Sequence, residues 1–208
     1  MAAGGYRRAA LVLAGLLLAS GPAAASRVLP EIAPPAPSVL APIEDGEDLP
    51  TLATVRLEAR PAARLEGQAP WEDAHAALAE AGTRLAQALA DAGIAAAGRP
   101  LAAYLTGDDA GFGFEVLLPL ARAPTPEEVA AAQETEPAIG FGATRGGYAL
   151  RALHEGPYAE IDATYEALTA ALDRDGLIVE DVILEEFLTD AKDEDDPSLR
   201  VAIYLFPK

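Results

Sequence analysis

Apolar side chains recur at helical spacing in two stretches of the chain, residues 72–92 and 158–174. The apolar positions are Ala74, Leu78, Leu85 and Leu89 in the first stretch, and Ile161, Tyr165, Leu168 and Leu172 in the second. Residues three or four apart lie on one face of a helix, so each stretch predicts an amphipathic helix. Gly93 and Gly176 follow the two stretches and are typical helix stops.

Apolar runs with alternating character predict strands around each helix. We expect strands at 54–65 (broken by Pro61), 101–106, 112–120, 148–154, 182–189 and 199–206. Each half of the domain then has the order strand, helix, strand, strand. The similarity of residues 101–106 (LAAYLT) to 184–189 (LEEFLT) supports a repeat.

This order predicts the fold class. One helix on three strands buries little apolar surface, whereas two such units joined edge to edge form a core. We therefore expect an α+β domain over residues 51–208, with repeat one at 51–120, a connector at 121–147 and repeat two at 148–208. It would contain one mostly antiparallel six-stranded sheet, with two helices on one face and a concave ligand cleft on the other.

The first 50 residues have a different composition. Arg7 and Arg8 precede an apolar run at 9–19 and an Ala-Ala-Ala string ending at Ala25. These are the parts of a secretory signal peptide, and the run is short of the about 20 residues that a membrane span needs. We expect cleavage after Ala25 and a secreted or periplasmic protein. The Pro-rich stretch at 26–50 predicts a flexible linker.

The charge narrows the classes of partner. The chain of 208 residues has a net charge of -18 at pH 7 and no cysteine. Nucleic acids and anionic membrane surfaces need clustered Lys and Arg, so we expect neither a nucleic-acid partner nor membrane insertion after signal removal. Cationic or neutral small molecules are the ligands that this negative charge does not repel. Without cysteine the chain forms no disulfide and no thiolate metal site.

Several short motifs resemble the GyrI-like family, also called the effector-binding domain of bacterial transcription activators. The matching residues are Gly147-Tyr148, His154-x-Gly156-Pro157-Tyr158, Glu185-x-Phe187-Leu188-x-Asp190, Ile203-x-Leu205-x-Pro207 and, in the first half, Gly98-x-Pro100-x-x-x-Tyr104. The resemblance covers residues 55–208. It implies a domain that binds hydrophobic, often cationic, organic molecules between its two repeats. The family is related in fold to the SOUL haem-binding proteins, but no axial ligand is identifiable here and we expect no cofactor.

The resemblance also implies a pocket glutamate, which maps to Glu185, with Phe187 where the family usually has Tyr. Residues two apart on a strand share one face, and a carboxylate beside an aromatic ring suits a lipophilic cation. Glu186 is the alternative, because a register error of one residue exchanges the two faces. A further alternative places both glutamates in solvent on an edge strand.

Four aromatic residues are candidates for the walls of the cleft: Tyr104, Tyr148, Trp71 and Tyr158. Packing of a helix start onto the sheet is an equally good interpretation of Trp71, Tyr158 and Tyr165. His75 and His154 lie in different repeats without metal-ligand spacing, so we expect no metal site.

The leading functional hypothesis is an exported small-molecule-binding protein. One alternative is a hydrolase of reactive organic compounds in which Glu185 serves as general acid or base, although no second catalytic group is identifiable. The other is an envelope protein-interaction module.

Overall fold

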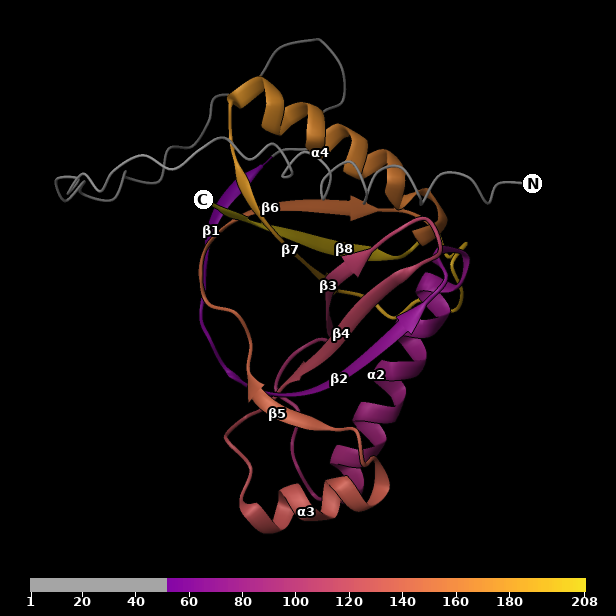
Figure 1. The fold of residues 1–208 in the computed structure, drawn as a ribbon, viewed down its shortest axis with the longest axis vertical. Coiled ribbons are helices and arrows are strands. Elements are labelled where there is room, and N and C mark those ends of the chain that lie inside the picture. Colours follow the sequence, from indigo (N-terminus) through magenta and orange to yellow (C-terminus); the bar gives the residue numbers. More distant parts are fainter. Residues whose placement is uncertain (1–51) are drawn as a thin grey trace, which may run out of the picture.

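The computed structural model describes residues 52–208, which form one antiparallel sheet with helices packed on it (Figure 1). The predicted signal peptide (1–25) and linker (26–50) lie outside the described residues. No helix in the described part is long and apolar enough to cross a membrane.

The sheet contains eight strands. They are β1 (Ala53–Leu57), β2 (Pro61–Ala69), β3 (Leu101–Gly107), β4 (Phe112–Pro119), β5 (Gly140–Ala143), β6 (Gly147–Glu155), β7 (Val179–Phe187) and β8 (Arg200–Pro207). Their order across the sheet is β1-β6-β8-β7-β3-β4-β2-β5, and every neighbouring pair is antiparallel. The α-helices are α2 (Ala74–Asp91), α3 (Pro126–Thr135) and α4 (Ile161–Asp175), with 3-10 helices at Trp71–Asp73 and Tyr158–Glu160.

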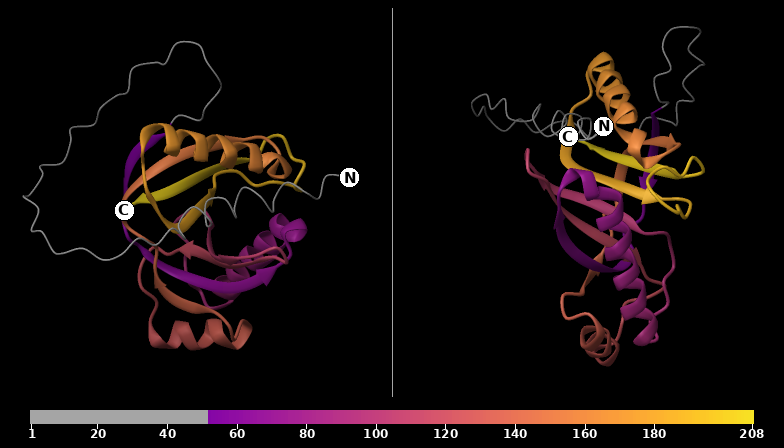
Figure 2. Two further views of the ribbon diagram at one scale, coloured as in Figure 1. Left: turned by 45° about the horizontal axis from the view of Figure 1, so that its top comes forward. Right: turned by 90° about the vertical axis from the view of Figure 1, so that its right-hand side faces the viewer.

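Helices α2 and α4 pack on the same face of the sheet. Their predicted apolar stripes, including Leu85 on α2 and Leu168 on α4, are buried in one cluster with β4 and β8 residues such as Val116 and Ile203. Figure 2 shows α4 over the half built on β6 and β8, and α2 along the half built on β2 and β4. The α+β class, the antiparallel sheet and the shared helix face are therefore confirmed.

The prediction of six strands was wrong, because one predicted strand is two and the predicted connector contributes β5. The stretch 54–65 is two strands: β1 pairs with β6 of the second half, while β2 pairs with β4 of the first. The chain passes from one half of the sheet to the other between Leu57 and Pro61, and we had predicted a break in the strand at Pro61. A pattern of apolar residues indicates a strand but not its partner, so this exchange was invisible in the sequence.

We predicted a plain connector at 121–147, but this stretch contains α3 and β5. Thr125 and Glu128 form a capping box, in which each side chain bonds the other residue's backbone N–H, and Pro126 occupies the first helical turn. These are standard helix-start residues. Strand β5 then pairs with β2. The start of α3 was therefore readable from the sequence, although its hydrophobic face is weak.

The two halves meet where β7 pairs with β3. In this register Glu185 lies opposite Ala102 on β3 and Ile203 on β8. Ala102 is completely buried and small, so it leaves space above the sheet beside Glu185. The seam between the halves thus places a carboxylate in the centre of the sheet.

The face opposite the helices carries a smaller apolar cluster that includes Leu101, Leu184, Tyr204 and Phe206. The β1–β2 and β5–β6 connections lie against each other at its margin. The backbone N–H of Thr144 donates to the Arg60 carbonyl (2.8 Å), and the Arg60 N–H donates to the Thr144 hydroxyl (3.0 Å). These bonds hold the two halves together on the side away from the helices.

Candidate functional site

Three tyrosine hydroxyls surround the buried carboxylate of Glu185. Tyr165 donates to its Oε1 at 2.7 Å, Tyr158 donates to its Oε2 at 2.8 Å, and Tyr104 lies 3.1 Å from the same oxygen. The hydroxyls of Tyr104 and Tyr158 are also 2.6 Å apart. Glu185 is completely buried. We call these four residues the tyrosine–glutamate cluster.

Elements from both halves build this cluster. Tyr158 and Tyr165 are seven residues apart, about two helical turns, so both rings point from the start of α4 towards the sheet. Gly156 precedes them with a φ of 136°, a conformation that L side chains rarely adopt. This turn sets the direction in which the chain enters the helix. Tyr104 comes from β3 of the first half, so the cluster spans the seam.

Burial dominates the electrostatics of the cluster. Desolvation raises the pKa of Glu185, and the hydrogen bonds from Tyr165, Tyr158 and Tyr104 oppose that rise. Burial, followed by the charge of Glu185, raises the pKa of Tyr158 and of Tyr165 well above the usual range. Within residues 52–208 no basic side chain forms an ion pair with Glu185. Glu185 therefore has hydrogen-bond donors but no opposite charge nearby among these residues. An ionised carboxylate in an apolar site is unfavourable without such a charge.

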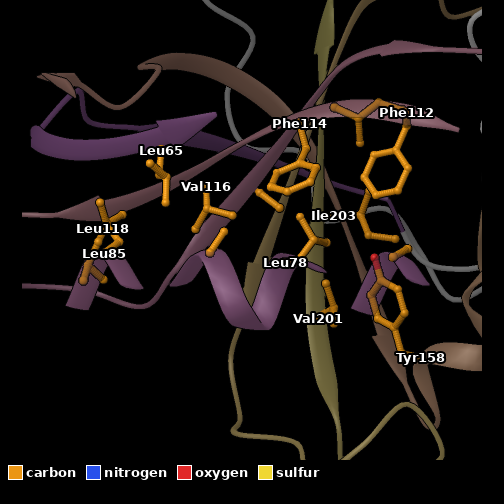
Figure 3. Close-up of a cluster of buried hydrophobic side chains, with 14 of the residues drawn as sticks. Leu65, Leu78, Leu85, Phe112, Phe114, Val116, Leu118, Tyr158, Val201 and Ile203 are labelled. Atoms are coloured by element: carbon orange, nitrogen blue, oxygen red, sulfur yellow. The ribbon is translucent and has the colours of Figure 1, made fainter. Parts of the chain in front are cut away.

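An apolar cavity of about 290 Å³ lies beside the cluster, lined by residues of α2 and of the segment after β7. Its wall includes His75, Leu78 and Phe187. The Tyr158 ring stacks with Phe187 at 6.0 Å between ring centres and lies 5.4 Å from the His75 ring. These rings separate the cavity from the Glu185 carboxylate. Figure 3 shows Tyr158 with Leu78, Phe112 and Phe114, neighbours in the buried apolar cluster.

The structure corrects the predicted position of the cleft relative to Glu185. We expected the ligand cleft on the face opposite the helices, but Glu185 lies on the same face as α2 and α4, under Tyr158 and Tyr165. Glu186 points to the opposite face, where its carboxylate accepts a hydrogen bond from the Tyr204 hydroxyl at 2.6 Å. The alternation along β7 thus separates the two glutamates, and neither lies on an edge strand.

The other sequence candidates are divided between this site and positions outside it. Tyr104, Tyr158 and Phe187 gather around Glu185, as described above. Trp71 is separated from Tyr104 by one ring: it stacks on Phe112, which contacts Tyr104, and its indole N–H donates to the Asp108 carbonyl at 2.7 Å. Tyr148 is 57% exposed and lies beside Arg56, away from the cluster.

Two residues of the site escaped prediction. The sequence analysis interpreted Tyr165 as helix packing and gave His75 no role, because it lacks metal-ligand spacing. The seven-residue spacing of Tyr158 and Tyr165 was a usable signal, because it places two hydroxyls on the helix face that meets Glu185. His154 is bonded instead to Thr164 and to the Pro157 carbonyl at the end of β6. In the described part of the chain, no three His, Asp or Glu side chains gather as metal ligands.

The fold and the site define an α+β domain with two helices covering a buried carboxylate at the seam of an antiparallel sheet. No family model matches the chain, and no curated protein matches it. Solved structures do match. The C-terminal domain of EcmrR gives a TM-score of 0.61 at 13% identity, covering 77% of this chain and 98% of that domain.

Two further structures show the same architecture. EcmrR in complex with DNA gives a TM-score of 0.62 at 13% identity, covering 77% of this chain and 58% of that one. A hydrolase encoded by lin2189 from Listeria innocua gives 0.57 at 11% identity, covering 77% of this chain and 94% of that one. At these identities the comparisons establish a shared fold.

Proposed function

We propose that the protein is an exported small-molecule-binding protein of the GyrI-like type, whose ligand is a hydrophobic organic cation. One observation carries this proposal: the fully buried Glu185 has three neutral hydroxyl donors and no basic partner among residues 52–208. A cation would supply the missing counter-charge, and the rings of Tyr104, Tyr158 and Phe187 would contribute cation–π attraction of about 0.5–2 kcal/mol. The motif resemblance implies the same class of ligand, and the fold is shared with the EcmrR C-terminal domain.

The ligand enters through the cavity that His75, Leu78 and Phe187 line. The His75 and Phe187 rings of its wall pack against Tyr158, whose hydroxyl bonds the fully buried Glu185. Binding therefore requires Tyr158 and Phe187 to move apart, which exposes the carboxylate to the cation. The cost of this opening lowers the observed affinity and is offset by the new ion pair.

A panel of aryl probes that differ in charge tests the proposal. Tetraphenylphosphonium, its anionic counterpart tetraphenylborate and the neutral triphenylphosphine oxide are compared by thermal shift on the chain from Ser26. We expect the phosphonium alone to stabilise the protein strongly, by about 2.7 kcal/mol at a hundred times its dissociation constant.

The matched control variant is Glu185→Gln, which keeps the shape and removes the charge. We expect it to abolish the preference for the phosphonium over the phosphine oxide. Equal stabilisation by all three probes in the wild type, or an unchanged preference in the variant, would contradict the proposal.

A second candidate function is hydrolysis of a reactive organic compound. The raised pKa of Glu185 is the feature a general acid or base needs, and one protein of the same fold is a hydrolase. Turnover that is lost in Glu185→Gln while the substrate still binds would favour this candidate. Binding of the compound without its hydrolysis would favour the first candidate, a small-molecule-binding protein.

Export rests on residues 1–25. We propose cleavage after Ala25, and N-terminal sequencing of protein recovered from outside the cytoplasm tests it. A chain that begins at Ser26 is the expected result, whereas one that still begins at Met1 contradicts cleavage. The net charge of -18 opposes phosphate binding, so nucleic acid is not among the proposed partners.

A further inference from the structure

Three oxygen atoms of the tyrosine–glutamate cluster form a closed triangle. Oε2 of Glu185 lies 2.8 Å from the Tyr158 hydroxyl and 3.1 Å from the Tyr104 hydroxyl, and the two hydroxyls are 2.6 Å apart. The two shorter distances are typical of hydrogen bonds between oxygen atoms, and the third is only slightly longer. We call this arrangement the oxygen triangle. Tyr165 lies outside it and donates to Oε1 at 2.7 Å.

The number of protons in the triangle differs between the two ionisation states of Glu185. Each tyrosine hydroxyl carries one proton, so an ionised Glu185 leaves two protons for three contacts between oxygen atoms. One pair of oxygens is then close together without a proton between them. A protonated Glu185 supplies the third proton: Tyr158 donates to Oε2, Oε2 donates to Tyr104, and Tyr104 donates to Tyr158. Oε1 is then the carbonyl oxygen and still accepts from Tyr165.

The titratable groups packed around the cluster do not neutralise a carboxylate there. From α2, the His75 ring contacts Tyr158, at 5.4 Å between ring centres, and within residues 52–208 it forms no ion pair with Glu185. From α4, Asp162 adds a negative charge that contributes to the raised pKa of Tyr165. The residues opposite Glu185 on β3 and β8 are apolar. Burial raises the pKa of Glu185 in these surroundings.

We infer that ligand binding at Glu185 exchanges one proton for one organic cation. This exchange rests on the proposed function, which places the cation at this carboxylate. In the ligand-free protein the oxygen triangle holds the proton on Glu185. When the cation displaces Tyr158, the O–H bond of the carboxyl group breaks and the proton passes to the buffer. The carboxylate left behind pairs with the cation, so the site buries no unpaired charge in either state.

The exchange gives the affinity for a cation a pH dependence of definite sign. Below the raised pKa of Glu185 the cation competes with a proton, so its affinity should fall about tenfold for each unit by which the pH falls. Above that pKa the carboxyl group is already ionised. The affinity should then be independent of pH, and binding should release no proton.

Calorimetric titration of the chain from Ser26 with tetraphenylphosphonium tests the exchange, because this cation is permanently charged and carries no ionisable proton. Titrations at each pH in two buffers with different heats of ionisation measure the number of protons released. We expect about one proton per cation at acid pH, falling towards none at alkaline pH. His75→Asn and Asp162→Asn remove the neighbouring titratable groups, and both variants should retain the release.

A substitution in the triangle tests its part in holding the proton. Tyr104→Phe removes the acceptor of the Glu185 proton, whereas Tyr158 can still donate to the ionised carboxylate. The release should therefore persist only to a lower pH than in the wild type. Tyr148→Phe is the matched control, since Tyr148 is 57% exposed, and should leave the pH profile unchanged. Equal profiles for the two variants would contradict the role of the triangle.

The protonated acid can also be detected without a ligand. Infrared spectra of the free protein at about pH 6, where exposed glutamates are ionised, should show a carbonyl band that is missing from Glu185→Gln. Absence of this band would overturn the inference. Saturable phosphonium binding without proton release at any pH would also overturn it, while leaving the proposed function intact. Absence of phosphonium binding would overturn the proposed function and the exchange together.

Discussion

Glu185 is surrounded by hydroxyl groups that suit either of its protonation states. As a carboxylate it accepts from Tyr165, Tyr158 and Tyr104; as an acid it can donate to one of their oxygens. The sequence motif located Glu185 and Phe187, and the helical spacing located the apolar face of α4. Neither identified Tyr165 as a partner, because a hydrophobic pattern records which face is buried but not which hydroxyl meets which acid.

The raised pKa of Glu185 gives a pH dependence with a definite sign. A carboxyl group whose pKa is higher in the folded state stabilises the fold at acid pH, and this contribution is lost as the pH rises through the raised value. Gln does not ionise, so a protein with Gln at this position does not lose this stability as the pH rises. We therefore expect the melting temperature of Glu185→Gln to exceed that of the wild type by a margin that grows from acid to alkaline pH.

Thermal denaturation of both proteins across this pH range measures the margin. Groups that do not interact with Glu185 titrate equally in the two proteins and cancel, including Asp162, whose pKa burial and the neighbouring Glu166 raise to about 6. The pH range stops short of the titration of Tyr158 and Tyr165, because the charge of Glu185 contributes to their raised pKa values. A margin that shrinks as the pH rises would contradict the assignment of Glu185 as a destabilising buried charge.

Removal of one hydroxyl from the cluster should cost more than removal of an exposed one. Tyr165→Phe leaves Oε1 of Glu185 without its donor at 2.7 Å, and we expect a loss of about 1–3 kcal/mol in the free energy of unfolding at neutral pH. Tyr148→Phe is the matched control, since Tyr148 is 57% exposed. Equal losses in urea denaturation of the two variants would show that the Tyr165 hydroxyl contributes nothing specific.

At the scale of the elements, most helices and strands follow from local pattern, while α3 and β5 do not. Helices α2 and α4 have strong apolar stripes and are followed by Gly93 and Gly176, both of which have positive φ. Helix α3 buries only Ala132, so its capping residues are its main sequence signal. It is joined to α2 by the ion pair between Arg84 and Glu136 at 2.6 Å.

The capping box of α3 can be tested with one substitution. Thr125→Ala removes the side-chain acceptor of the Glu128 N–H, and we expect a cost of about 0.5–2 kcal/mol. Thr83→Ala is the control, because the Thr83 hydroxyl bonds the Ala79 carbonyl within α2, where Ala is the better helix former. If chemical denaturation shows Thr125→Ala to be as stable as Thr83→Ala, the cap does not stabilise α3.

At the scale of the whole molecule, each half of the sheet includes a strand from outside its own repeat. Strand β1 completes the half that contains α4, and β5 extends the half that contains α2. Strand partners are set by long-range contacts, which alternation along the sequence does not encode. The same pairing creates the site: the register of β7 with β3 brings Tyr104 of one half to Glu185 of the other.

The most direct test of the account is a crystal structure of the chain from Ser26 with tetraphenylphosphonium bound. We predict the cation between α2 and α4, with its charged centre within about 6 Å of the Glu185 carboxylate and aromatic rings packed against it. Tyr158 should have left its position over that carboxylate. A cation bound elsewhere, with Glu185 still sealed beneath Tyr158 and Tyr165, would contradict the central claim.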